Sequence, residues 1–176
     1  MTVKYFKGDL FKLTNETTSS PLLLAHSCNC IGIWGGGIAK QFKINYFNSY
    51  KLYNKYCQIV SNPNDLLGKS LLLSTDENVI IVCLFTSIIG EENELEIVHN
   101  TKLSLIDLYN KLKDPQLIED KKVRNIIINY NNEINMDISK YIVNMPLINS
   151  GIFGVSWGLT EKELIESELN CHVYKL

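Results

Sequence analysis

The chain has 176 residues, of which 45% are hydrophobic and 20% are charged, and its formal net charge at pH 7 is −2. A length of this order predicts one domain whose core needs no disulfide or metal to fold. Arg124 is the only arginine and the lysines are scattered, which argues against a nucleic-acid partner because nucleic-acid-binding faces cluster basic side chains. No apolar run approaches the ~20 residues of a membrane span, so no membrane partner is expected.

Five cysteines, an odd number, indicate free thiols in a reducing compartment. From Met1 the sequence passes directly into a strand pattern, so we expect no targeting segment. These features predict a soluble monomer of the cytoplasm or nucleus.

The predicted elements follow from apolar alternation, apolar runs and helical spacing of apolar residues. In chain order they are strand 3–7, strand 22–25, helices 38–47 and 49–60, strands 70–73 and 79–85, helix 97–112, strand 141–145, helix 160–169 and strand 172–176. Thr160 followed by Glu163 predicts a capping box at the start of the last helix. Residues 14–21 form a predicted polar loop, and the polar stretch 113–140 is interpreted as an insertion.

Strands that alternate with helices predict an α/β protein with a largely parallel sheet and helices on both faces. Ligands of such sheets bind at the carboxyl ends of the strands. Three signals fall at these ends: Gly8-Asp9, the loop of residues 26–37, and residues 149–154. Their coincidence predicts a ligand site at this edge of the sheet.

Two glycine-rich loops are the strongest local features. In residues 22–41, LLLAHSCNCIGIWGGGIAKQ, a strand and a polar tip precede the glycine triplet 35–37 and the start of a helix. The second loop, Ser150-Gly151-Ile152-Phe153-Gly154, follows the strand 141–145. Glycines let backbone N–H groups approach an anion, and a helix N-terminus favours negative charge. With a single arginine in the chain, we expect backbone amides to hold a phosphate here.

His26 ends a central predicted strand beside the first glycine loop, where it could act as a general acid or base. The alternative is a core histidine bonded to a backbone carbonyl. Asn29 could orient a hydroxyl or a water molecule but cannot be a strong base. His99 and His172 are interpreted as structural or exposed residues.

Cys28-Asn29-Cys30 raises the possibility of thiol chemistry. Cysteine phosphatases carry an arginine about six residues after the nucleophile, and this chain has glycines there. A zinc site needs four suitably spaced ligands, whereas Cys57, Cys83 and Cys171 are isolated in the sequence. The sequence therefore predicts neither a metal nor another cofactor, and any hydrolysis would be direct attack by water.

The segments GDL, SCN, WGGGIA and MPLINSGIFG together resemble a macro domain, and they are similar to its yeast ADP-ribose 1''-phosphate phosphatase branch. The resemblance covers nearly the whole chain apart from about residues 113–140. It implies one macro domain over residues 1–176, with a three-layer α/β/α sandwich and a mixed sheet. It also implies ADP-ribose binding and hydrolysis of ADP-ribose 1''-phosphate, a tRNA-splicing by-product, to ADP-ribose and phosphate.

By this resemblance Asp9 accepts from the adenine amino group with Leu10 behind it, Asn29 faces the distal ribose, and Phe153 packs on that ribose. His26 and Asn29 are the catalytic candidates. The expected ligand-binding residues are Gly8, Asp9, Leu10, Ser27, Cys28, Asn29, Trp34, Gly35, Gly36, Gly37, Ile38, Ala39, Ile148, Asn149, Ser150, Gly151, Ile152, Phe153 and Gly154.

Two departures from the family pattern bear on activity. Macro domains that remove ADP-ribose from acidic side chains often carry Asp two residues after the last glycine, where this chain has Ala39. Another branch uses Lys after the strand 79–85 and Asp in the late loop, where this chain has Thr86-Ser87 and Phe153. A non-catalytic ADP-ribose reader and a weak ADP-ribosyl glycohydrolase therefore stay open as alternatives. A P-loop nucleotide-binding protein is disfavoured because the GxxxxGK pattern is absent.

Overall fold

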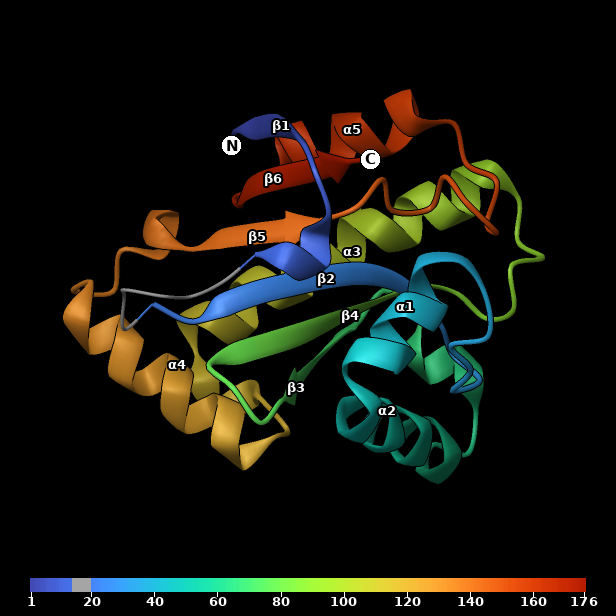
Figure 1. The fold of residues 1–176 in the computed structure, drawn as a ribbon. Coiled ribbons are helices and arrows are strands. Elements are labelled where there is room, and N and C mark those ends of the chain that lie inside the picture. The colour runs from blue at the N-terminus through green and yellow to red at the C-terminus, as the bar shows by residue number, and fades with distance from the viewer. Residues whose placement is uncertain (14–19) are drawn as a thin grey trace.

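The computed structural model describes residues 1–13 and 20–176, so most of the predicted polar loop 14–21 lies outside the described residues. Within them, a central sheet lies between two layers of helices (Figure 1). The strands are β1 (Val3–Lys7), β2 (Leu22–Asn29), β3 (Ser70–Ser74), β4 (Val79–Ser87), β5 (Ile142–Met145) and β6 (Asn170–Lys175).

The sheet has the order β1-β6-β5-β2-β4-β3. Every neighbouring pair is parallel except β3 and β4, which form an antiparallel edge. The predicted mixed, largely parallel sheet is confirmed. Strand β2 is longer than predicted, because the polar segment from His26 to Asn29 continues its pairing with β4.

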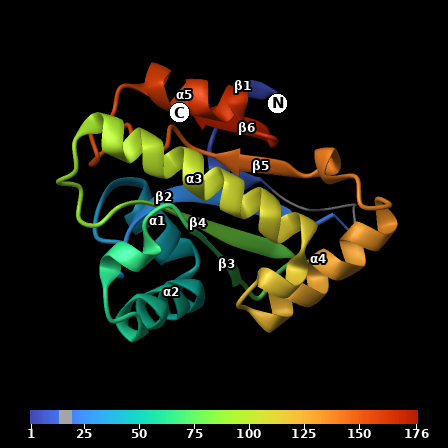
Figure 2. The same ribbon diagram turned by 180° about the vertical axis from the view of Figure 1, so that it is seen from behind.

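Five α-helices cover the described sheet: α1 (Gly37–Asn45), α2 (Phe47–Ile59), α3 (Glu94–Lys113), α4 (Lys121–Glu133) and α5 (Trp157–Glu166). Helices α1 and α2 lie on one face, whereas α3, α4 and α5 lie on the other, as the two opposite views show (Figures 1 and 2). This is the three-layer α/β/α arrangement expected from the sequence. None of the helices in the described residues is long and apolar enough to cross a membrane.

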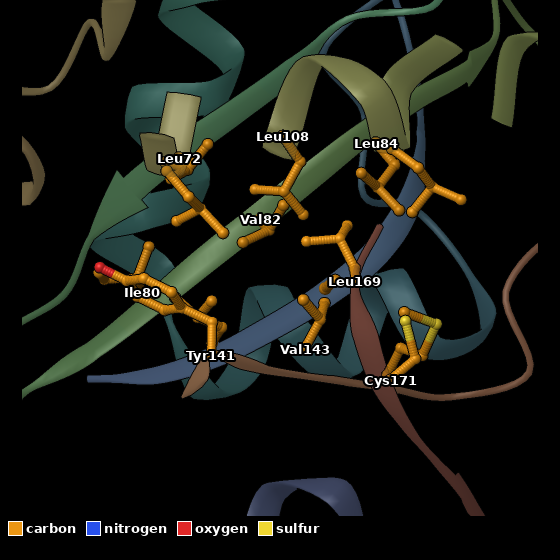
Figure 3. Close-up of a cluster of buried hydrophobic side chains, with 14 of the residues drawn as sticks. Leu72, Ile80, Val82, Leu84, Leu108, Tyr141, Val143, Leu169 and Cys171 are labelled. Atoms are coloured by element: carbon orange, nitrogen blue, oxygen red, sulfur yellow. The ribbon is translucent and has the colours of Figure 1, made fainter. Parts of the chain in front are cut away.

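The central strands supply side chains to both layers because successive residues of a strand point to opposite faces. In β2, Leu23 and Ala25 join the core beneath α3, α4 and α5, while Leu24 and Cys28 join the core beneath α1 and α2. Strand β4 is buried along its whole length and alternates in the same way. Figure 3 shows part of the first core, with Val143 and Cys171 among its side chains.

The polar stretch 113–140 contains helix α4, which was not predicted from the sequence. Asp120 caps the helix by accepting from the backbone N–H groups of Lys122 and Val123. Val123 and Ile127 are fully buried in the core, and Asn131 donates from its side chain to the Leu112 carbonyl. The few apolar residues lie at helical spacing, but polar neighbours on the exposed side obscure the pattern.

The predicted capping box at Thr160 is wrong. Helix α5 begins at Trp157 with Ser156 as its N-cap, and Thr160 is fully buried within the helix. Its hydroxyl accepts a hydrogen bond from the side chain of Asn149, so a tertiary contact explains why a threonine stands there.

Helix α4 is expected to stabilise the whole domain. Ile127→Ala should lower the free energy of unfolding by about 2–5 kcal/mol, because the removed side chain leaves a cavity in the core. Asn125→Ala, at an exposed position of the same helix, is the matched control and should change stability by less than about 0.5 kcal/mol. Denaturant unfolding measures both, and an unchanged Ile127→Ala variant would show that α4 does not support the core.

Candidate functional site: an anion clamp at the edge of the sheet

Strands β1, β2, β4, β5 and β6 run parallel, so their carboxyl ends meet at one edge of the sheet. The loops that leave this edge hold the residues singled out from the sequence. They are Gly8-Asp9 after β1, residues 30–36 after β2, residues 88–93 after β4 and residues 146–156 after β5.

The N-terminus of α1 is open toward this edge. Its N-cap is Gly36, which forms no side-chain capping hydrogen bond. Helices α2 and α5 also lack such a bond, whereas Asn93 and Asp120 cap α3 and α4 with their side chains. Gly37 has a φ of +57°, a conformation that favours glycine. The first N–H groups of a helix have no partner within the helix and carry the positive end of its dipole. This terminus is therefore suited to an anion.

The second glycine loop contacts the first. The Cδ1 atom of Ile152 lies 3.2 Å from where a Cβ atom on Gly36 would stand, although 72% of the Ile152 side chain is exposed. Gly154 closes the loop by donating its N–H to the Gly151 carbonyl at 3.0 Å. In the described part of the chain, no hydrogen bond engages the N–H groups of residues 151–153. The structure thus brings the two loops together at the end of β2.

Asn149 fixes the second loop to four elements. Its Oδ1 accepts from Thr86 Oγ1 of β4 at 2.8 Å, and its Nδ2 donates to Thr101 of α3 at 2.9 Å and Thr160 of α5 at 3.4 Å. Its backbone N–H donates to Ser27 Oγ of β2 at 3.0 Å. Asn149 is 3% exposed and has a φ of +65°, a left-handed conformation that asparagine tolerates better than most residues. Its side-chain oxygen and nitrogen are both engaged in hydrogen bonds within the protein, and these bonds support the loop.

Asn29 shapes the loop after β2. Its Oδ1 accepts from the backbone N–H groups of Ile31 and Ile33, and its Nδ2 donates to the Ile33 carbonyl. The hydroxyl of Tyr53 on α2 donates to the Asn29 carbonyl at 2.6 Å. The predicted ribose-facing residue therefore also holds the glycine loop in place.

Asp9 and Leu10 lie beside the end of β6. Gly8 donates its N–H to the Lys175 carbonyl at 2.8 Å, and the Oδ1 of Asp9 accepts from the N–H of Phe11 at 2.9 Å. Leu10 is buried beneath this turn. The Asp9 side chain therefore caps this turn, and a ligand contact through its second oxygen stays a prediction.

His26 is fully buried. Its ring stacks on Phe42 with centroids 4.0 Å apart and meets Trp34 edge-on, and its Nε2 lies 3.4 Å from Cys28 Sγ. Trp34 is also fully buried and stacks on Tyr53. A general acid must come within hydrogen-bond reach of its substrate, and this position offers His26 no surface. Its predicted catalytic role is not supported by its position, and the side chains of Trp34 and Cys28 likewise face the core.

Phe153 lies over the loop that follows β4. Its ring is 3.3 Å from the position of a Cβ atom on Gly90, whose φ is +88°. Glu92 closes that loop by accepting from the Ile88 N–H at 2.7 Å and from the Ser87 hydroxyl. Burial raises the pKa of the Glu92 carboxyl, but these two hydrogen bonds outweigh it, so the pKa falls below its ordinary value. Glu92 was not predicted as a site residue, because its role depends on the fold of the loop.

The remaining predicted residues occupy the same edge. Ile38 and Ala39 are partly buried in the first turn of α1, Ile148 is buried in the core, and the buried Ser150 hydroxyl has no partner among the described residues. Gly35 and Gly36 line the tip of the first loop against Ile33 and Ile152.

Comparison with known proteins assigns this arrangement to a family. Residues 25–164 match the family model described as the macro domain. The chain belongs to the macro domain family. Solved macro domains are among its structural neighbours. The macrodomain of Mycobacterium tuberculosis DarG has a TM-score of 0.65 at 22% identity, and the alignment covers 99% of this chain and 98% of that one. Thermosipho africanus DarTG, solved in complex with ADP-ribose, has a TM-score of 0.57 at 16% identity over 97% of this macro domain and 41% of that chain.

Yeast proteins named ADP-ribose 1''-phosphate phosphatase are similar to this macro domain over nearly their full length. The protein of Lodderomyces elongisporus is 41% identical over 179 residues, covering 99% of this chain and 98% of that protein. Those of Candida albicans and Debaryomyces hansenii are 39% and 37% identical over 174 and 187 aligned residues, each covering 98% of both chains.

Two substitutions of Asn149 should distinguish how its side-chain hydrogen bonds and its backbone conformation each affect the free energy of unfolding. Asn149→Ala is expected to lower the free energy of unfolding by about 2–4 kcal/mol, because buried hydroxyls lose their partner. Asn149→Gly loses the same bonds but relieves the left-handed backbone, so it should be about 1 kcal/mol more stable than the alanine variant. Chemical denaturation measures both. Equal stability of wild type, Asn149→Ala and Asn149→Gly would contradict the anchoring role of Asn149.

Proposed function

We propose that this macro domain hydrolyses ADP-ribose 1''-phosphate to ADP-ribose and inorganic phosphate. The observation that carries the proposal is the meeting of the two glycine loops at the uncapped N-terminus of α1. The names of the similar yeast proteins support the same substrate. Its proposed ligands are small ADP-ribose derivatives, and its proposed state is a monomer. Five free cysteines support the reducing compartment of the cytoplasm or nucleus, and the scattered lysines argue against a nucleic-acid partner.

Backbone amides supply the positive field in the proposed complex. The N–H groups at the start of α1 and those of residues 151–153 face the diphosphate and the distal phosphate from two sides. The second carboxylate oxygen of Asp9 accepts from the adenine amino group. Nδ2 of Asn29 has one hydrogen beyond the one given to Ile33, and this hydrogen contacts the distal ribose.

The proposed reaction is direct attack of water on the distal phosphorus. The bond between phosphorus and the ribose oxygen breaks, the ribose oxygen takes a proton, and the attacking water becomes part of inorganic phosphate. Amides aimed at the phosphoryl oxygens stabilise the charge that develops on them. His26 acts in this scheme as a positioning residue, because its ring packs on Trp34 and thereby supports the loop that carries Gly35 and Gly36.

A non-catalytic ADP-ribose reader is the second candidate. Ile38 and Ala39 follow the glycine triplet in the first turn of α1, so neither of these two positions supplies a carboxylate base, and this favours a reader. The two candidates share the same proposed binding site and differ in turnover. Phosphate release from ADP-ribose 1''-phosphate distinguishes them, because a reader binds ADP-ribose and releases none.

The contact between the loops should control turnover. In Gly36→Val the new side chain meets Ile152, so phosphate release should fall at least about tenfold, equivalent to about 1.4 kcal/mol. Gly158→Ala is the matched control, since a Cβ atom at this exposed helix position meets nothing within 4 Å, and it should retain full activity. If wild type and Gly36→Val released phosphate at the same rate, the clamp would be refuted. If wild type released no phosphate, the non-catalytic ADP-ribose reader would be the supported function.

Asp9 should contribute to adenine binding. Asp9→Ala is expected to weaken ADP-ribose binding by about 1.5–3 kcal/mol, the range of a hydrogen bond to a charged group. Asp9→Asn is the control for the turn, because its side-chain oxygen can still accept from Phe11 while the charge is lost. Calorimetric titration measures the three affinities. Wild-type affinity in Asp9→Ala would assign Asp9 to the turn alone.

A further inference from the structure

A histidine and two cysteines converge beneath α1 and α2. The parallel pairing of β2 with β4 aligns His26 with Cys83 and places Cys28 two residues further along. One ligating atom of each of the three residues lies within 4.8 Å of the others, and all three side chains are buried. Cys83 seemed isolated in the sequence, and the pairing of the strands brings it to the other two.

We propose that these three residues bind one Cu(I) ion, through an imidazole nitrogen of His26 and the sulfur atoms of Cys28 and Cys83. The site is separate from the proposed phosphate clamp, which draws on backbone amides at the surface. In the proposed hydrolysis no atom of this cluster touches the substrate, and His26 acts only through its contact with Trp34.

The donor set selects for a soft ion. Thiolate sulfur favours Cu(I) and Zn²⁺ over Mg²⁺ and Ca²⁺, which prefer oxygen ligands. Structural zinc sites are almost always four-coordinate, and the group within the described residues supplies three donors. Cu(I) is stable with three ligands, and the burial of the cluster leaves no surface from which water would complete a zinc site.

Two further cysteines, Cys30 and Cys57, lie in the same core. Neither belongs to the group whose ligating atoms all lie within 4.8 Å of one another. The Cys30 thiol donates instead to the Ser87 carbonyl at 3.3 Å. Geometry therefore limits the proposed ligand set to His26, Cys28 and Cys83.

The surroundings of Cys28 offer a hydrogen-bond donor that would stabilise a thiolate. The indole N–H of Trp34 is buried without a hydrogen-bond partner in the described chain. The Trp34 side chain lies close enough to the Cys28 thiol to interact with it. In the proposed site this N–H donates to the Cys28 sulfur and offsets part of its negative charge.

Cu(I) forms bonds to two sulfurs and one nitrogen, and any proton still on either thiol passes to solvent. Copper stays in the Cu(I) state, so no oxidant or reductant takes part. The bound ion and two thiolates carry one net negative charge.

An anaerobic titration of the whole protein with Cu(I), in competition with a chromogenic Cu(I) chelator, tests the proposal. Wild type should take up one Cu(I) per chain, and copper X-ray absorption should show two sulfur ligands and one nitrogen ligand. Cys28→Ser and Cys83→Ser should each weaken binding at least about a hundredfold, a loss of about 2.7 kcal/mol. Cys171→Ser is the matched control, because this equally buried cysteine lies in the opposite core, and it should bind like wild type (Figure 3).

Folding is checked for each copper-free variant by circular dichroism and thermal unfolding, and Cys83→Ala serves as a second variant at the same position. Loss of binding in a folded Cys83 variant supports the site. Absence of uptake by wild type, equal loss in Cys171→Ser, or dependence on Cys57 in place of Cys83 would overturn it. Tighter binding of Zn²⁺ than of Cu(I) would overturn the assignment of the ion.

Discussion

The hydrogen bonds of the buried Asn149 side chain hold together the edge of the sheet at which the candidate site lies. One amide joins Thr86 of β4, Thr101 of α3 and Thr160 of α5, and the backbone of the same residue contacts Ser27 of β2. A buried polar network of this kind is stable only when its members are paired, so removal of one member is costly. The loop after β5 therefore has one position relative to the end of β2, and Ile152 is held against Gly36.

This constraint explains how a chain with one arginine could bind a doubly charged diphosphate. Backbone N–H groups are suitable donors only when the backbone is held in place, since ordering a loop on binding would cost conformational entropy. Asn29 holds the first loop by three bonds to residues 31 and 33, and Asn149 holds the second. In the proposed function, two asparagines thus prepare a site whose positive field comes from the main chain and from the N-terminus of α1.

Much of this arrangement could be predicted from local sequence. The glycine loops, the apolar central strands and their alternation with helices were sufficient for the fold class and for the edge that carries the site. The burial of His26 could also have been predicted. His26 lies two residues after the apolar Leu24, so both side chains point to the same face of β2. The hydrogen-bond partners of Asn149 and the approach of Cys83 to His26 could not be predicted from local sequence. Both depend on strand register and on helix packing between residues that are distant in the chain. Helix α4 was missed because its buried residues are outnumbered by polar ones.

In the proposed complex two backbone loops close on the phosphates of ADP-ribose. Titration of ADP-ribose into ¹⁵N-labelled protein, followed by amide chemical shifts, tests it most directly. We expect the largest changes on the amides of residues 36–39 and 151–153, with little change in α4. Shifts concentrated elsewhere, for example along the groove between α3 and α5 lined by Tyr109 and Glu166, would contradict it.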